Sequence, residues 1–235
     1  WEIKNELVRA EKKHNRYAST EWLAARGQKG AKPEGSFAFS RFEILQTLEP
    51  VSAMRYLEQV HGDRIQTLTM AEPGIELVGE GDAMITGDRG TALVIRTADC
   101  IPILIFCPES GTIAAVHAGW RGLAAKIVTQ TISALCNDRS ARKAGLHFMV
   151  GPFIARDSYE VGDEVASQFL PGASHVRPNA KYSLDLEKIL RAEFAANAIN
   201  EDQVEWHYTD TFVSPGWYSA RRGDSLRNFS LIARF

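Results

Sequence analysis

The sequence predicts a globular fold that combines buried β-strands with amphipathic α-helices. Three short apolar runs, Ala92–Ile95, Ile101–Phe106 and Ile113–Val116, are rich in Val and Ile and are bounded by Pro and Gly. Continuous runs of this kind are typical of strands that are buried on both faces. Residues 123–135 instead carry apolar side chains at the spacing of one helix face. Both kinds of element are therefore expected in this chain.

The composition is that of an ordinary globular protein. Of 235 residues, 45% are hydrophobic and 24% are charged, so the chain can bury a core as one large or two small domains. A formal net charge of −2 gives no sequence-wide argument for binding nucleic acid or an anionic membrane. No apolar stretch reaches the roughly 20 residues of a membrane-spanning helix. Three sparse cysteines fit a reducing compartment, and we therefore expect a cytoplasmic protein.

The N-terminal third of the chain predicts an extension followed by the first strands. Residues 1–36 are expected to form an N-terminal extension with a surface helix over 2–25, and residues 37–235 the main domain. Residues 36–48 alternate loosely and predict a first strand. Residues 54–65 predict a strand or strand pair that breaks at His61, because the following glycine lets the backbone turn sharply. A polar glycine-rich loop is expected over 79–84.

The remaining elements follow the three apolar runs. A helix is expected from Gly119 to Leu135, with its N-terminus pointing back at His117, where unpaired amides favour an anion. A strand is expected over 147–150, and helices over about 163–170 and 184–196. Strands over 204–208 and 230–235 are expected to close the fold, separated by a polar loop that contains several arginines.

Three side chains are the leading candidates for chemistry: His61, Cys100 and His117. Two imidazoles and one thiolate are ligands that Zn²⁺ accepts, and they leave a fourth position for water or substrate. Bound zinc would lower the pKa of such a water to about 7. The spacings match no short metal motif, so buried structural roles for the same residues remain open. A third interpretation makes Cys100 a nucleophile, His117 its base, and Asp99 or His61 the orienting group.

Arginines and carboxylates supply the candidates for substrate binding. Guanidinium groups present planar donor pairs to phosphate or carboxylate oxygens, although surface salt bridges are their more common use. Arg121 stands out because it follows His117 by four residues. Asp99, Glu160 and Asp82 are candidate acid/base groups, with capping or turn hydrogen bonds as the alternative.

Five motifs occur in a set order along the chain. They are Gln59-Val60-His61-Gly62, Thr97-Ala98-Asp99-Cys100, His117-Ala118-Gly119-Trp120-Arg121-Gly122, Gly151-Pro152 and Tyr159-Glu160-Val161-Gly162. Together they resemble the YlmD/YfiH family, which is also called the laccase-domain or multicopper polyphenol oxidase family. The resemblance covers about residues 54–235.

The resemblance implies a fold, a metal and an activity. The fold is an α+β single domain with α/β/β/α layers, similar to cytotoxic-necrotising-factor-like cysteine hydrolases. The metal is zinc, with copper as the alternative, held by His61, Cys100 and His117. The activity is phosphorolysis of adenosine, inosine, guanosine and methylthioadenosine, together with deamination of adenosine. The implied partners are a nucleoside and inorganic phosphate, for a monomer or homodimer.

Within this resemblance, four residues are expected to bind substrate or phosphate: Arg121, Arg41, Arg222 and Glu160. The chain departs from the family pattern early, where Phe39-Ser40-Arg41 is only a partial counterpart of a Thr-x-Arg-x-Gly-Gly segment. It also has Phe153 where the family has a cysteine after Gly-Pro. The three residues that the resemblance implies as metal ligands are present despite these departures.

Three other functions use the same residues differently. A cysteine-dependent amidase or peptidoglycan-precursor editing hydrolase would act through the Cys100 thiol. A copper-binding polyphenol oxidase would consume oxygen, but one site of two histidines and one cysteine does not supply the several copper sites of laccase chemistry. A non-catalytic binding protein would keep the fold without needing the thiol.

Overall fold

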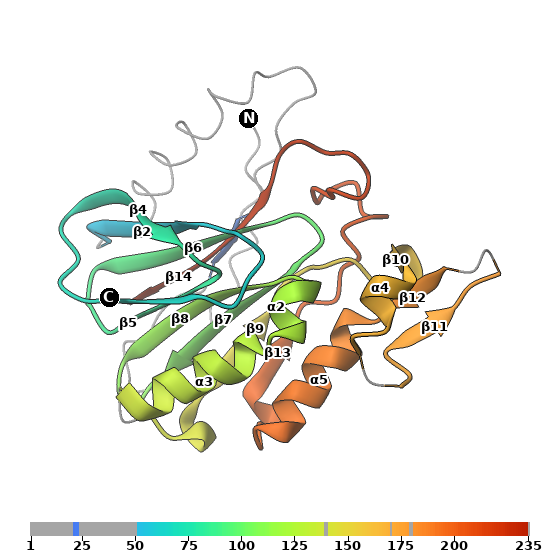
Figure 1. Ribbon diagram of the computed structural model, residues 1–235. Helices are drawn as coiled ribbons and strands as arrows, with labels where there is room; N and C mark the ends of the chain where they lie inside the picture. The colour runs from blue at the N-terminus through green and yellow to red at the C-terminus, as the bar shows by residue number, and fades with distance from the viewer. Residues whose placement is uncertain (1–20, 24–50, 139–140, 170, 179–180, 235) are drawn as a thin grey trace.

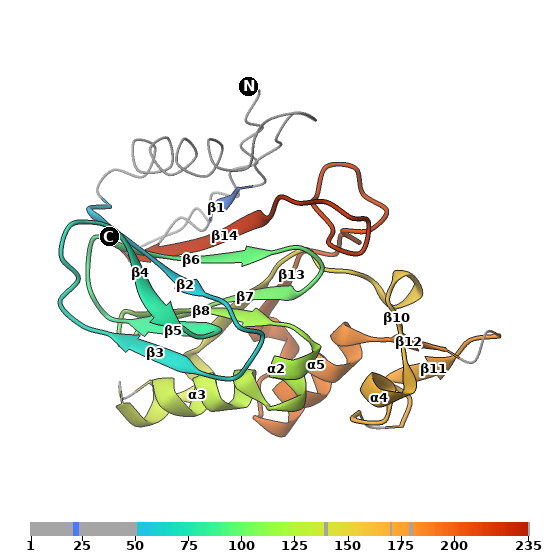
Figure 2. The same cartoon turned by 45° about the horizontal axis from the view of Figure 1, so that its top comes forward.

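The computed structural model describes residues 21–23, 51–138, 141–169, 171–178 and 181–234. Two β-sheets are stacked on each other at the centre of the molecule (Figure 1, Figure 2). The five-stranded sheet has the order β1 (Glu21–Leu23), β14 (Asn228–Arg234), β6 (Thr91–Thr97), β2 (Ala53–Glu58) and β4 (Gly74–Glu80). The six-stranded sheet has the order β13 (Val204–Trp206), β9 (His147–Val150), β7 (Ile101–Cys107), β8 (Thr112–Ala118), β5 (Ala83–Thr86) and β3 (Ile65–Leu68).

Helices cover the outer face of the six-stranded sheet (Figure 1). They are α2 (Trp120–Ala124), α3 (Ile127–Asp138) and α5 (Leu186–Ala196). A small sheet extends to one side of these layers together with α4 (Asp163–Ala166), and its strands are β10 (Glu160–Val161), β12 (Tyr182–Leu184) and β11 (Ser174–Val176). Three single turns of 3-10 helix lie at Lys143–Gly145, Arg156–Ser158 and Glu201–Gln203.

Strand β7 is buried on both faces and joins two apolar cores. Ile103 and Ile105 belong to the cluster between the six-stranded sheet and the helices. Leu104, which points to the opposite face because side chains alternate along a strand, belongs to the cluster between the two sheets. Each fully buried Leu or Ile contributes about 1.5–3 kcal/mol relative to an exposed one, so burial on both faces makes this strand a large contributor to the stability of the fold.

The predicted strands are largely confirmed. The three apolar runs form β6, β7 and β8, and the predicted strand over 147–150 forms β9. The mixture of sheets and helices agrees with the expected α+β class. The described residues supply a helix layer and two sheet layers of the expected α/β/β/α arrangement. Residues 24–50, which include the predicted strand over 36–48, lie outside the described part of the chain.

Three predictions about helices were wrong in part, and one strand pair was missed. The helix expected over 119–135 is two helices, because Lys126 adopts a φ of +64° that ends one and starts the next. The helix expected over 163–170 has only one turn, α4. Residues Glu21–Leu23, placed in a surface helix over 2–25, form strand β1, which pairs with β14 along its exposed edge. The hairpin of β11 and β12 was not predicted.

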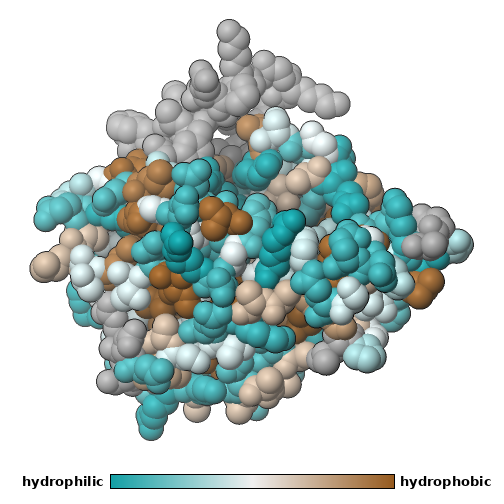
Figure 3. All heavy atoms as spheres, in the orientation of Figure 1, coloured by the Kyte–Doolittle hydropathy of each residue, from teal (hydrophilic) through white to brown (hydrophobic). Residues whose placement is uncertain are grey.

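The surface carries few large apolar groups. The face drawn in Figure 3 is mainly hydrophilic, with small separate hydrophobic patches. None of the described helices combines the length and apolar character needed to cross a membrane.

Candidate metal centre

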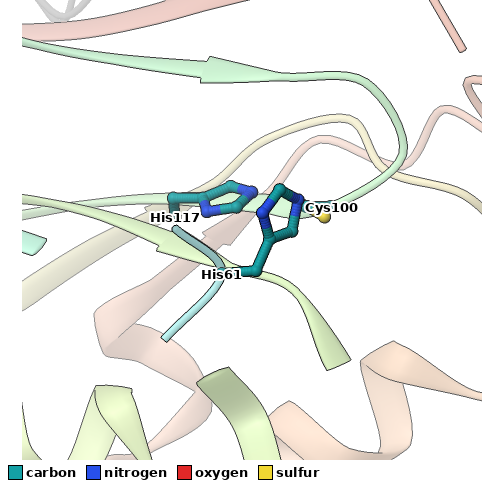
Figure 4. A group of neighbouring side chains, drawn as sticks. All are labelled: His61, Cys100 and His117. Carbon is teal, nitrogen blue, oxygen red and sulfur yellow. The ribbon is translucent and has the colours of Figure 1, made fainter. Parts of the chain in front are cut away.

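His61, Cys100 and His117 converge at one end of the six-stranded sheet (Figure 4). His61 lies in the segment after β2, Cys100 immediately precedes β7, and His117 lies in β8. Their ligand atoms all lie within 4.8 Å of one another. One ion with metal–ligand bonds of about 2.0–2.3 Å holds its ligand atoms no more than about 4.6 Å apart, so the three side chains must move slightly closer together to share one ion.

Antiparallel pairing of β7 and β8 brings Cys100 and His117 together. Pro102 lies opposite His117 and Ile101 lies opposite Ala118, so the start of β7 is beside the end of β8. Residues 17 positions apart in the sequence therefore become neighbours in space. The hairpin is held by apolar side chains on both faces, which makes this end of the sheet a rigid platform.

His61 reaches the site through an unusual backbone conformation. Its φ is +60°, in the left-handed region that non-glycine residues rarely adopt. The next residue, Gly62, packs against helix α2, where a Cβ on Gly122 would lie only 2.9 Å from the Gly62 carbonyl oxygen. Glycine at position 122 therefore lets α2 approach the His61 segment. The His61 and His117 rings meet edge to face, with centroids 4.8 Å apart.

A buried carboxylate, Asp82, organises two of the three ligands. Its Oδ1 accepts hydrogen bonds from His117 Nδ1 at 2.7 Å and from the His61 backbone N–H at 2.9 Å. Its Oδ2 accepts from the Gly62 N–H at 2.7 Å. Burial alone would raise the pKa of Asp82, but these hydrogen bonds lower it below its ordinary value. Asp82 thus stays ionised and commits the other ring nitrogen, Nε2 of His117, to the site.

Electrostatics at the site favour a thiolate. Removal from water would raise the pKa of Cys100, but hydrogen bonds and positive charge from His117 and His61 lower it to about 6. Burial would lower the pKa of His117, but its bonds to Asp82 and Cys100 raise it to about 9. A thiolate is the form of cysteine that binds metals and attacks electrophiles.

The donor set fits a metal ion. Two imidazoles and one thiolate are zinc ligands, and a buried carboxylate behind one imidazole is the usual support for such a ligand. Glycine at position 119 keeps the site open, because a Cβ there would lie 3.1 Å from the Cys100 sulfur and 3.5 Å from His61 Cδ2. His61 is exposed and Cys100 partly so, which gives solutes access to the three donor atoms.

Other predicted site residues occupy different places. The Asp99 carboxylate accepts hydrogen bonds from the Thr211 hydroxyl and the Arg221 backbone N–H, both at 2.7 Å. The orienting role considered for Asp99 is thus filled by Asp82. Glu160 forms ion pairs with Lys181 and Arg177 in the small sheet. The Glu160 carboxylate, which was expected to bind substrate, is therefore already paired with two cations.

The arginines also differ in their surroundings. Arg222 donates hydrogen bonds to the carbonyl oxygens of Thr211 and Phe212 and pairs with Asp224, so its guanidinium holds the loop before β14. Arg121 lies over the ring of Trp120, close to the site. Arg41 lies outside the described residues.

Two residues near the site, Asp82 and Tyr159, make contacts that the sequence does not indicate. Asp82 is one of three candidate carboxylates in the sequence, and its place in the glycine-rich segment just before a strand is the available signal. Tyr159 was noted only as part of a motif, yet Arg221 lies over its ring and the charges of Cys100 and Asp99 affect its pKa. Contacts between residues 21 to 62 positions apart do not show in a single sequence.

A family model described as multi-copper polyphenol oxidoreductase laccase matches residues 38–234. The chain belongs to this family. Its relatives include proteins named YfiH, so the resemblance to the YlmD/YfiH family is confirmed. The family implies metal binding, and the group of His61, Cys100 and His117 is the candidate for it among the described residues.

Relatives in this family are named for an enzyme activity. A Deinococcus radiodurans protein named purine nucleoside phosphorylase is 44% identical over 113 residues, which cover 48% of this chain and 42% of that protein. The Escherichia coli (strain K12) purine nucleoside phosphorylase YfiH is 34% identical over 169 residues, which cover 68% of this chain and 66% of that protein. The chain thus matches less than two thirds of each of these relatives.

A solved structure of a family member confirms the fold. The crystal structure of the Bacillus licheniformis hypothetical protein YfiH aligns with a TM-score of 0.85 over 93% of both chains, at 20% sequence identity. This similarity establishes the α+β single-domain fold of the family for this chain.

Proposed function

We propose that this protein is a zinc-dependent purine nucleoside phosphorylase that also deaminates adenosine. The observation that carries the proposal is the accessible group of two imidazoles and one acidic thiol, in a chain whose relatives are named purine nucleoside phosphorylase. The expected substrates are adenosine, inosine, guanosine and methylthioadenosine, each with inorganic phosphate. The products are the free base and ribose 1-phosphate, or its methylthio form.

His61, Cys100 and His117 would hold the zinc. When bound with one position open, zinc supplies a Lewis acid that polarises a substrate oxygen or activates water. The protein's own part is to keep the three donors in place. Asp82 holds the His117 ring and the His61 backbone, so the donors are oriented before any substrate arrives.

The two reactions differ in the atom attacked. In phosphorolysis a phosphate oxygen forms a bond to C1′ of the ribose, the C1′–N9 bond breaks, and its electron pair leaves with the purine, which takes up a proton. In deamination water adds at C6 of adenine and ammonia leaves, giving inosine. Arg121, the phosphate candidate whose guanidinium lies beside the site, would neutralise the attacking phosphate.

The test is to incubate zinc-loaded protein with adenosine, with and without phosphate. Phosphorolysis yields adenine and ribose 1-phosphate only when phosphate is present, whereas deamination yields inosine in both cases. His61→Ala and Cys100→Ala variants, checked for zinc content, should lose both activities. If the zinc-loaded protein forms neither adenine nor inosine, the proposal is wrong.

A second candidate function is that of a cysteine hydrolase. It is favoured by the arrangement of Cys100, His117 and Asp82, in which an acidic thiol, an imidazole and a buried carboxylate are connected. Such an enzyme would keep its activity on amide substrates, including peptidoglycan precursors, after zinc is removed by a chelator. Activity that alkylation of Cys100 abolishes but chelation spares would favour this candidate over the first.

A further inference from the structure

Two arginines beside the metal centre lie on aromatic rings rather than on carboxylates. The guanidinium carbon of Arg121 is 4.4 Å from the centroid of the Trp120 ring. The guanidinium carbon of Arg221 is 5.3 Å from the centroid of the Tyr159 ring. Within the described part of the chain, neither guanidinium has a hydrogen-bond acceptor or an acidic partner. An aromatic ring attracts the cation but leaves the N–H groups at its edge available to another acceptor.

The surrounding arginines are committed elsewhere. Arg222, next in the sequence to Arg221, donates to several carbonyl oxygens and to Asp224. Arg177 donates to Ser183 and to a carbonyl oxygen, and Arg156 pairs with Asp157. The availability of Arg121 and Arg221 is therefore a local feature of this site and not a general property of arginines on this surface.

The backbone places both arginines next to the metal centre. The N–H of Arg221 donates to the carboxylate of Asp99, the residue before Cys100. Arg121 lies two residues after Gly119, where an added Cβ would lie 3.1 Å from the Cys100 sulfur. Their side chains also affect a common neighbour. Burial and the charge of Cys100 together raise the pKa of Tyr159 to about 12, against the opposing charges of Arg221 and Arg121. The thiol, the phenol and both guanidiniums thus lie in one neighbourhood.

Building on the proposed function, we propose that Arg121 and Arg221 form the subsite for inorganic phosphate, with the Tyr159 hydroxyl as a third donor. Planar guanidinium groups bind phosphate oxygens in pairs, and two positive charges match the dianion. Trp120 and Tyr159 limit the rotamers of the two arginines, so less side-chain freedom is lost when phosphate binds. A phosphate held here lies beside the metal centre, where C1′ of the nucleoside is expected.

The test measures phosphate and nucleoside dependence separately. Arg121→Ala and Arg221→Ala should each raise the KM for phosphate by about tenfold or more, equivalent to about 1.4 kcal/mol, while the KM for adenosine changes by less than about twofold. Tyr159→Phe should raise the phosphate KM by a smaller factor. Arg227→Ala is the matched control, because Arg227 belongs to the same loop and donates only to nearby carbonyl oxygens. Zinc content should stay unchanged in all of these variants, and Arg227→Ala should also keep the phosphate KM of the wild type.

A binding measurement separates this inference from the proposed function. Inorganic phosphate should raise the melting temperature of the zinc-loaded wild type, and this rise should disappear in Arg121→Ala and Arg221→Ala. If phosphate stabilises the protein in this way but no phosphorolysis occurs, the subsite stands and the proposed reaction is wrong. If phosphorolysis occurs but its phosphate KM is unchanged in both variants, the subsite is overturned and the reaction stands. Absence of both effects in the wild type overturns both.

Discussion

Replacement of Asp82 by asparagine tests the physical basis of the metal centre. The carboxylate accepts three hydrogen bonds, from His117 Nδ1, the His61 N–H and the Gly62 N–H, at 2.7–2.9 Å. An asparagine has one oxygen, so its amide NH₂ must face at least one of these donors. The variant thus loses a hydrogen bond to a charged acceptor, worth about 1.5–3 kcal/mol, and leaves a buried donor unsatisfied at about 1–3 kcal/mol. We expect the free energy of unfolding to fall by about 2.5–6 kcal/mol in total.

The same substitution should weaken metal binding in the molecules that remain folded. Loss of the group that orients a metal-ligating histidine typically lowers metal affinity by about 10–100-fold. Urea unfolding of the metal-free protein measures the first effect, and zinc titration against a competing chelator measures the second. Asp88→Asn is the control, because the Asp88 carboxylate accepts one hydrogen bond, from Ala71 N–H, which an amide oxygen can also accept.

One outcome would rule out a supporting role for Asp82 in the metal centre. If Asp82→Asn unfolds within about 0.5 kcal/mol of the wild type and binds zinc within about twofold of it, then neither the hydrogen bonds nor the charge of Asp82 support the centre. A stability loss without any change in zinc affinity would restrict Asp82 to a structural role.

Four other substitutions or treatments have defined outcomes. Gly119→Ala should lower zinc affinity by about tenfold with little change in stability, because its Cβ would lie 3.1 Å from the Cys100 sulfur. The control is Gly62→Ala, whose Cβ would meet only ordinary contacts at 3.6 Å or more, so its zinc affinity should stay closer to that of the wild type. Chelation should lower the melting temperature of the wild type but not of Cys100→Ala, because zinc at 100-fold above its Kd stabilises the folded state by about 2.7 kcal/mol. Burial raises the pKa of Glu193, so the stabilising contribution of this side chain is present below the ordinary glutamate pKa and is lost as pH rises. Glu193→Gln should therefore be more stable than the wild type at neutral pH. In melting experiments at different pH values, this advantage should disappear near pH 4. His61→Gly should unfold at a higher urea concentration than His61→Ala in the metal-free state, because glycine tolerates the φ of +60°.

The predictable part of the fold is the part in which one kind of residue fills most of an element. Strands β6, β7 and β8 are buried on both faces, so the run of residues at the centre of each strand is apolar and the pattern needs no tertiary information. The division between α2 and α3 depends on one residue, Lys126, whose side chain carries no signal for a positive φ. Short elements such as β10 and β11 depend on contacts with neighbouring segments, which local patterns do not reveal.

The candidate site was predictable to a similar degree. The ligand residues could be chosen because thiol and imidazole groups next to strand ends are few in this chain. The groups that support these ligands could not be chosen from the sequence. Arg221 and Arg222 are adjacent and chemically identical, yet one lies over Tyr159 beside the site and the other binds loop carbonyl oxygens. Which of two neighbouring side chains faces a site is decided by the backbone conformation of the loop.

Strained backbone at two positions indicates that the metal centre is formed by the fold itself. His61 and Asp99, one a ligand and the other next to a ligand, have φ values of +60° and +87°. Such conformations cost about 1–3 kcal/mol each and persist only where surrounding contacts impose them. Those contacts are the Asp82 carboxylate on the His61 N–H, and the Thr211 hydroxyl and Arg221 N–H on the Asp99 carboxylate. Because all of them are bonds within the protein, they hold the backbone at His61 and next to Cys100 independently of any ion.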